Sequence, residues 1–242
     1  MADEAFANRR LADLYDVLDG DRNDLDVYLS IASELAATTV LDVGCGTGTF
    51  ALLLADNCFE VLGVDPDRPS VEVARRKPGA ERVTWIEGDA TRLPPHEGDL
   101  VTMTANVAQA IADESDWHTT LEAARVALRR RDGHLVFETR DPARRAWEGW
   151  TREESHQVFD VPGLGVLERW FDLLRVDGPL VTFRGTFVFP DGDVLTSDST
   201  LRFRERDEIE RDLVAHGFAV EDVRDAPDRP GRELVFIARQ AG

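Results

Sequence analysis

Residues 40–50 read Val-Leu-Asp-Val-Gly-Cys-Gly-Thr-Gly-Thr-Phe. A short apolar segment here runs into three glycines at alternate positions, and a segment with helical character follows. Glycines in such a turn let the backbone bend sharply and approach a ligand without a clash from Cβ. The stretch therefore predicts a buried strand, a glycine-rich turn that can receive a ligand, and a helix.

Strand and helix patterns alternate on both sides of this turn. Strands are predicted over 38–43, 59–65, 83–87, 99–104, 134–139, 218–223 and 233–238. Helices are predicted over 49–55, 69–76, 117–128 and 207–216. Strand-helix-strand order forces parallel pairing with right-handed crossovers. We expect an α/β protein with a Rossmann-like, doubly wound, seven-stranded, mostly parallel sheet.

Two segments depart from this alternation. Apolar residues at helical spacing predict helices over 6–18 and 24–35, which would form an N-terminal cap within residues 1–36. Three longer strands are predicted over 164–174, 180–189 and 194–203, with turn signals between them. We therefore expect an antiparallel β insertion over 141–204, after the fifth strand, in a main domain made of residues 1–140 and 205–242.

Composition limits the classes of function. The net charge of -19 argues against a nucleic-acid partner, which would need clustered cations. No segment is long and apolar enough for a membrane helix, and the acidic start at Met1–Glu4 does not resemble a secretory signal, so we expect a soluble, cytoplasmic protein without a membrane partner. Cys45 and Cys58 fit neither a disulfide framework nor a zinc site, so no metal is expected.

Carboxylates stand before the glycine turn and after the next strand. Asp42 lies two residues before Gly44, and Asp65 ends the segment Val61-Leu62-Gly63-Val64-Asp65. In nucleotide-binding α/β folds, an acid at the second position accepts hydrogen bonds from both hydroxyls of a ribose. Asp65 could equally cap the following helix, but its spacing from Gly44 favours the ribose.

The combination of Asp42 with G-x-G-x-G resembles motif I of class I S-adenosylmethionine-dependent methyltransferases; the dinucleotide fingerprint is G-x-G-x-x-G. The resemblance implies that S-adenosylmethionine is the cofactor, that Asp65 binds its ribose, and that Asp89 in Gly88-Asp89-Ala90 contacts the adenine amino group.

The end of the fourth strand narrows the resemblance to a bacterial subgroup of small-molecule methyltransferases. That subgroup carries an Asn and a Gln three residues apart, as Asn106 and Gln109 are here. The resemblance implies that Asn106 lies beside the methionine part of the cofactor, that Gln109 faces the acceptor, and that Tyr15 approaches the methionyl end. Ala110 stands where a His is common, which puts His-based acceptor chemistry in doubt. The implied cofactor residues are Tyr15, Asp42, Gly44, Cys45, Gly46, Gly48, Asp65, Pro66, Asp89, Ala90, Thr104, Ala105 and Asn106.

The predicted reaction is transfer of a methyl group to a small-molecule acceptor by in-line displacement, which needs alignment more than a dedicated base. The candidate catalytic residues are Gln109, Arg140 and His156; for His156 a solvated loop residue is the alternative. Trp147 and Trp150 could wall an acceptor pocket, although core packing is favoured. The acceptor, and whether O, N or C is methylated, stay open.

Two other functions remain as alternatives. A nicotinamide-dependent oxidoreductase would also be α/β and glycine-rich, but the glycine spacing and the acid at Asp42 disfavour it. A protein that binds S-adenosylmethionine without turnover is compatible with everything above. An exposed edge of the insertion could pair with a second copy, so a homodimer is also kept open.

Overall fold

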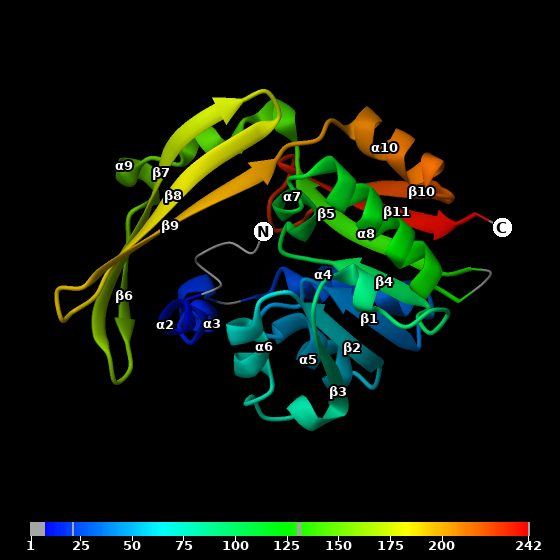
Figure 1. The fold of residues 1–242 in the computed structure, drawn as a ribbon, viewed down its shortest axis with the longest axis horizontal. Coiled ribbons are helices and arrows are strands. Elements are labelled where there is room, and N and C mark those ends of the chain that lie inside the picture. Colours follow the sequence, from blue (N-terminus) through cyan, green and yellow to red (C-terminus); the bar gives the residue numbers. More distant parts are fainter. Residues whose placement is uncertain (1–7, 21, 130–131, 242) are drawn as a thin grey trace.

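The computed structural model describes residues 8–20, 22–129 and 132–241 (Figure 1). Its main element is a seven-stranded sheet with the order β10-β11-β5-β4-β1-β2-β3. The strands are β1 (Thr39–Val43), β2 (Glu60–Asp65), β3 (Val83–Glu87), β4 (Leu100–Met103), β5 (His134–Arg140), β10 (Phe218–Asp225) and β11 (Glu233–Gln240). Each lies within a few residues of a predicted strand.

The sheet is parallel except at one strand. β1 pairs in parallel with both β2 and β4, and β4 pairs in parallel with β5. β11 runs antiparallel to both of its neighbours, β5 and β10. The winding reverses at β1, so the glycine-rich turn that follows β1 lies at the point where such sheets bind ligands. The predicted doubly wound, mostly parallel fold is confirmed.

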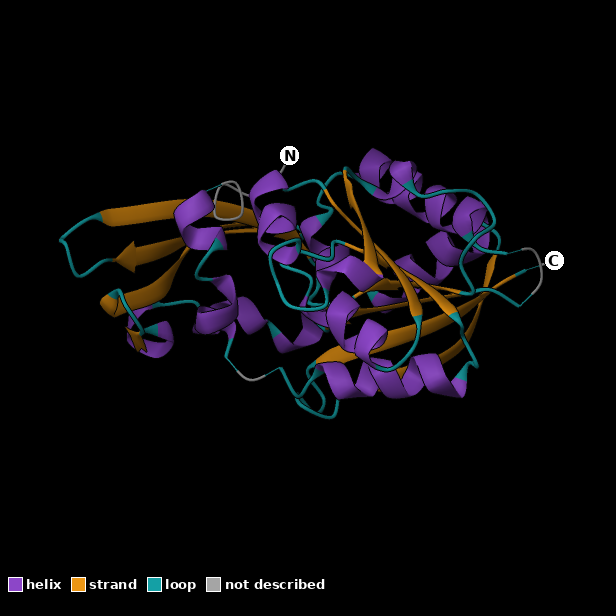
Figure 2. Cartoon of the chain, turned by 90° about the horizontal axis from the view of Figure 1, so that it is seen from below, coloured by secondary structure: helices purple, strands orange, loops and turns teal. Residues whose placement is uncertain are grey.

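Helices cover both faces of this sheet (Figure 2). On one face, α8 (Glu114–Ala127) and α10 (Arg206–Ala215) bury a core that includes the edge-to-face pair of Trp117 and Phe137. On the other face, α4 (Leu25–Glu34) and α5 (Thr49–Asp56) bury a second core. α6 (Arg68–Ala74) connects β2 to β3.

A second sheet extends from the main one like an arm (Figure 2). It is antiparallel, with the order β6-β7-β8-β9, and its strands are β6 (Gln157–Val161), β7 (Gly165–Asp177), β8 (Leu180–Val188) and β9 (Val194–Arg202). Three of these strands match the prediction for the insertion. β6 was not predicted, because it is a short edge strand whose outward residues are polar or exposed; the turn signal Pro162-Gly163 that follows it could have indicated a hairpin.

The predicted first helix is two short helices, α2 (Arg9–Ala12) and α3 (Tyr15–Asp19). They lie between the second sheet and α6 (Figure 1, blue). Leu11 and Leu18 are buried there in a cluster with Leu167 and Phe187, so both short helices pack against the second sheet. The predicted start of this helix at Phe6, and the acidic segment Met1–Glu4, lie outside the described residues.

Smaller differences concern helix ends. α8 begins at Glu114, before the predicted start at 117, because Asp113 caps it by accepting hydrogen bonds from the N–H groups of Ser115 and Asp116. The remaining helices are α7 (Val107–Ala110), α9 (Arg152–Ser155), η1 (Ala80–Arg82), η2 (Ala90–Arg92), η3 (Pro142–Arg144) and η4 (Ala146–Gly149). No helix in the described ranges is long and apolar enough to span a bilayer.

Candidate functional site

The three alternate glycines of the turn after β1 have different surroundings. All three have positive φ, +71° at Gly44, +54° at Gly46 and +81° at Gly48. A Cβ at Gly44 would lie 2.5 Å from Val107, and one at Gly48 would lie 2.4 Å from the Trp85 ring. A Cβ at Gly46 would meet no atom within 4 Å. The outer glycines therefore permit close packing, whereas the backbone of Gly46 borders open space.

Asp65 lies against this open backbone. Its Oδ2 accepts a hydrogen bond of 2.8 Å from the N–H of Gly46, and its Oδ1 accepts one of 2.8 Å from the N–H of Asp67. The carboxylate is 8% exposed, and burial raises its pKa. Each oxygen retains a lone pair for a further donor, so a ligand hydroxyl beside Gly46 could bind this carboxylate. Pro66, between these residues, is exposed.

Asp42 is buried below the turn. Its Oδ1 accepts a 2.9 Å hydrogen bond from the hydroxyl of Thr102, which links β1 to β4. Its Oδ2 has no partner among the described residues. Burial, with a smaller contribution from the negative charge of Asp65, raises the pKa of Asp42 to about 7 despite the bond from Thr102. Asp42 is only 1% exposed, so its carboxyl group lies beneath the surface of the site.

The loops after β3 and β4 complete the edge of the sheet. Gly88 N–H donates to the carbonyl of Asp65 at 2.9 Å, which holds the loop after β3 beside β2. Asp89 is exposed and caps η2 through Thr91, while Ala90 is buried. After β4, Ala105 and Asn106 both have left-handed φ angles, +58° and +61°.

The left-handed conformation of Asn106 is held by two buried glutamates. Its N–H donates to Glu138 Oε1 at 2.6 Å, and its Nδ2 donates to Glu233 Oε1 at 3.3 Å. The Tyr28 hydroxyl also hydrogen-bonds Glu138. Burial raises the pKa of Glu138 to about 7 although both bonds oppose this shift. The Oδ1 atom of Asn106 is buried without a partner among the described residues, so it can accept a donor from a ligand.

Gln109 and Arg140 form a pair next to this cluster. Gln109 Oε1 accepts a 3.0 Å hydrogen bond from Arg140 Nη1, and Gln109 is fully buried. Its Nε2 has no partner within the described ranges. Arg140 Nε lies 3.8 Å from Glu233, so the three polar residues form one network with Asn106. The predicted positions 106, 109 and 140 are brought together, and each side chain positions its neighbour.

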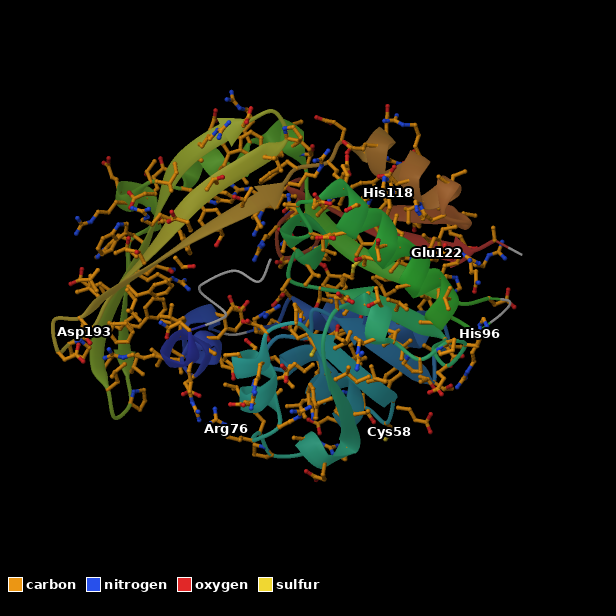
Figure 3. All side chains as sticks on the ribbon, viewed as in Figure 1. Cys58, Arg76, His96, His118, Glu122 and Asp193 are labelled. Atoms are coloured by element: carbon orange, nitrogen blue, oxygen red, sulfur yellow. The ribbon has the colours of Figure 1, made fainter. Side chains whose placement is uncertain are left out.

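Polar contacts join the N-terminal helices to the glycine turn. Asp16 Oδ1 accepts a 2.6 Å hydrogen bond from the Thr47 hydroxyl, and Asp16 Oδ2 lies 2.6 Å from Lys77 Nζ. On either side of this contact, Asp13 pairs with Arg76, and Arg10 pairs with Asp193 at 2.9 Å in the turn between β8 and β9. Figure 3 shows Arg76 and Asp193 on opposite sides of these helices. α2 and α3 thus connect the main sheet to the second one.

A cavity of about 210 Å³ lies between these helices and the inner face of the second sheet. Tyr15 lines it from α3, next to the residue that binds the glycine turn. Most of its wall is aromatic or aliphatic, and its polar residues include Arg169 and Asp19. Its full lining is Leu11, Ala12, Tyr15, Leu18, Asp19, Arg169, Phe171, Phe183, Gly185, Phe187, Ser197 and Ser199.

The part of the chain that carries the turn matches a known protein family. Residues 40–131 match the model of a family described as methyltransferase domain. Cypemycin N-terminal methyltransferase of Streptomyces sp is 32% identical over 110 residues, 44% of this chain and 45% of that protein.

Residues 40–131 are a methyltransferase domain.

The chain spans less than half the length of this relative. The whole chain resembles solved structures in fold. The CcbJ methyltransferase from Streptomyces caelestis has a TM-score of 0.77 at 20% identity, covering 100% of each chain. DesVI of Streptomyces venezuelae has a TM-score of 0.75 at 22% identity, covering 95% of this chain and 98% of that one. These structures confirm the predicted fold, and the family match over residues 40–131 agrees with the predicted methyltransferase family.

His156 is not brought to the methyltransferase domain's turn or to the cavity. It is exposed, and its Nε2 lies 2.9 Å from Glu168 on β7. Leu167 packs inward and Arg169 lines the cavity, so the intervening Glu168 points to the opposite, outer face of the second sheet. Figure 3 likewise shows His96 and His118 in the part of the molecule away from the second sheet.

The tryptophans pack as expected. Trp147 is buried with its ring centroid 4.5 Å from that of Phe203, and Trp150 lies 4.6 Å from Phe183. Trp150 thereby supports a residue of the cavity wall without lining the cavity itself.

The residues of the cavity wall on β7, β8 and β9 were not predicted as site residues. The alternation of aromatic with polar residues along 169–187 was the available signal, but it shows only that one face of the strands is covered. Only the contact with α2 and α3 shows which face encloses a cavity.

Proposed function

We propose that the protein is an S-adenosylmethionine-dependent methyltransferase that acts on a small molecule bound in the cavity between α2–α3 and the second sheet. The observation that carries this proposal is the open backbone of Gly46 beside the Asp65 carboxylate, inside a methyltransferase domain. An oxidoreductase is disfavoured by the same family match.

The residues present fit the cofactor. The open backbone at Gly46 would contact the adenosine, and the Asp65 carboxylate would accept hydrogen bonds from both ribose hydroxyls. The exposed Asp89 with the buried Ala90 would border the adenine, and Thr104, Ala105 and Asn106 would border the methionine part, where the unpartnered Oδ1 of Asn106 can accept a hydrogen bond. Tyr15 would close this end from α3. When bound, S-adenosylmethionine supplies a methyl group on an activated sulfonium leaving group.

The chain's contribution is positioning. Asp16 fixes α3 on the glycine turn, and its neighbour Tyr15 lines the cavity, so one helix forms part of both binding sites. Holding the two reactants in line can lower the activation barrier of methyl transfer by up to roughly 7–11 kcal/mol, and this contribution needs no general base. The apolar cavity wall excludes water from the reacting group. The network of Gln109 and Arg140 borders Asn106 and orients it.

Two measurements test the proposal. In calorimetry, S-adenosylhomocysteine should bind the protein and NADH should not; the reverse result would support the oxidoreductase. Incubation with methyl-labelled S-adenosylmethionine and fractionated metabolite pools should then transfer label into a small-molecule fraction. Cofactor binding with no transfer into any pool would instead indicate a binding protein without turnover.

Compartment and oligomeric state belong to the same proposal. A cytoplasmic location is supported by the two cysteines, which are both free, with Cys45 buried and Cys58 exposed. The net charge of -19 supports a partner other than nucleic acid. A homodimer could form through edge strands β6 or β9, and light scattering of the purified protein would show a doubled mass.

A further inference from the structure

Arg169 is a cation placed among aromatic rings. It projects from the inner face of β7 and lines the cavity. Its guanidinium carbon lies 5.0 Å from the ring centroid of Phe159 and 5.5 Å from that of Phe171. These rings, together with the hydrogen bond from Nη2 to Gln157 Oε1 on β6, hold the guanidinium in one orientation. Such an orientation is what a directional contact with a ligand requires.

The hydrogen bonds of Arg169 are incomplete. Within the described part of the chain its guanidinium donates only to the neutral amide of Gln157, and its buried Nε has no partner. Arg184 on the outer face of the same sheet differs, because it donates to both oxygens of Asp198 at 2.6 and 2.8 Å. An arginine carries five donors that match a carboxylate in two parallel bonds. Among the described residues, Arg169 therefore has no bonded acidic partner like that of Arg184.

The charge of Arg169 is also only partly compensated. Burial lowers the pKa of its guanidinium, and the negative charge of Asp19 across the cavity opposes that shift. Asp19 already lies 2.7 Å from Arg22, so it is shared between two cations. A partly buried cation without a bonded anion is unfavourable, and a ligand anion that reaches it recovers part of that cost.

We propose that Arg169 binds a carboxylate of the methyl acceptor, and that the acceptor is a single-ring molecule whose ring lies against Phe171, Phe183 and Phe187. This inference rests on the proposed function. The cavity of about 210 Å³ exceeds the roughly 150 Å³ of a cavity that holds benzene, so it has room for one ring with its substituents. Tyr15 lines the same cavity, and its neighbour Asp16 is bonded to the glycine turn, so the reacting end of the acceptor would lie toward Tyr15.

The inference is tested with three single-ring probes of similar shape. Benzoate, benzamide and benzylamine are titrated by calorimetry or ligand-observed NMR into the full-length protein saturated with S-adenosylhomocysteine. We expect benzoate to bind about 10- to 100-fold more tightly than benzamide, the range that hydrogen bonds to a charged group supply. Arg169→Gln should remove this preference, and Arg169→Lys should restore part of it. Arg184→Gln, on the other face of the sheet, should keep it.

The outcomes separate this inference from the proposed function. Binding of S-adenosylhomocysteine to the wild type and to Arg169→Gln reports the cofactor site and confirms that the variant is folded. If the cofactor binds but benzamide equals benzoate, or none of the three probes binds at millimolar concentration, the role of Arg169 is refuted while the proposed function stands. Tighter binding of benzylamine would also refute it and would assign recognition to Asp19. Failure of the wild type to bind the cofactor would refute the proposed function itself.

Discussion

The Asp16 carboxylate joins the N-terminal helix α3 to the glycine turn: one oxygen accepts a hydrogen bond of 2.6 Å from Thr47, and the other lies 2.6 Å from the Lys77 ammonium. The residue before it, Tyr15, lines the cavity. The two proposed binding sites therefore share one short helix, which polar contacts of Asp16 attach to the turn and apolar packing of Leu18 attaches to the second sheet.

We expect Asp16→Ala to weaken binding of S-adenosylhomocysteine about 5- to 20-fold, because α3 would no longer be held on the turn, a loss of about 1–2 kcal/mol in hydrogen bonding and ion pairing. Calorimetry measures the affinity, and limited proteolysis near α3 measures its release. Asp26→Ala, on the exposed side of α4, is the control and should leave both unchanged. Unchanged affinity in Asp16→Ala would show that the helix does not help to hold the cofactor.

We expect Asp65→Ala to weaken S-adenosylmethionine binding by about 1.5–3 kcal/mol, since it removes a charged acceptor of two ribose hydroxyls. The substitution also leaves the N–H of Gly46 without its present acceptor, which loosens the turn. Glu60→Ala, at the other end of β2 and exposed, is the matched control. Equal cofactor affinity of the two variants in calorimetry would contradict the ribose assignment.

We expect Gly46→Val to abolish cofactor binding in a protein that still folds, because the new side chain would project into the open space that the ligand needs. Gly48→Ala should instead lower the melting temperature, because its Cβ would lie 2.4 Å from Trp85. Gly178→Val, at φ +57° with open space around it in the turn after β7, controls for backbone strain. Calorimetry and thermal unfolding distinguish the two effects, and normal binding by Gly46→Val would show that the turn does not contact the ligand.

The main sheet could be predicted from the sequence because each of its elements is indicated by the residues of that element alone. A buried strand such as β1, a glycine turn and a helix each have their own composition, and the strand-helix alternation then restricts the pairing. The carboxylate at Asp65 could be placed beside the turn for the same reason, since the carboxyl ends of adjacent parallel strands meet at one edge.

The cavity could not be predicted, because it depends on contacts between segments far apart in the chain. Inward and outward residues alternate along β7, as in any strand with one covered face, and this pattern does not distinguish Arg169. Only the packing of Leu11 and Leu18 on the same face places Arg169 in a cavity. His156 was a reasonable candidate by residue type, but the pleat of β7 directs its partner Glu168 to the outer face. Strand register decides such positions, and single-sequence patterns do not contain it.

We expect stability to fall as the pH rises from about 5 to 8, because Glu138 is buried and its pKa rises from 4.5 to about 7 in the folded protein. Between these two values the folded state binds more protons than the unfolded state, so raising the pH favours unfolding. Across this window the loss from Glu138 is up to about 3 kcal/mol. Glu138→Gln retains an acceptor for the Asn106 N–H but does not titrate, so its stability should depend less on pH than that of the wild type. Urea unfolding at pH 5.5 and pH 8 measures the free energy of unfolding of both proteins. If the difference in this free energy between wild type and Glu138→Gln is the same at both pH values, Glu138 does not titrate in this range.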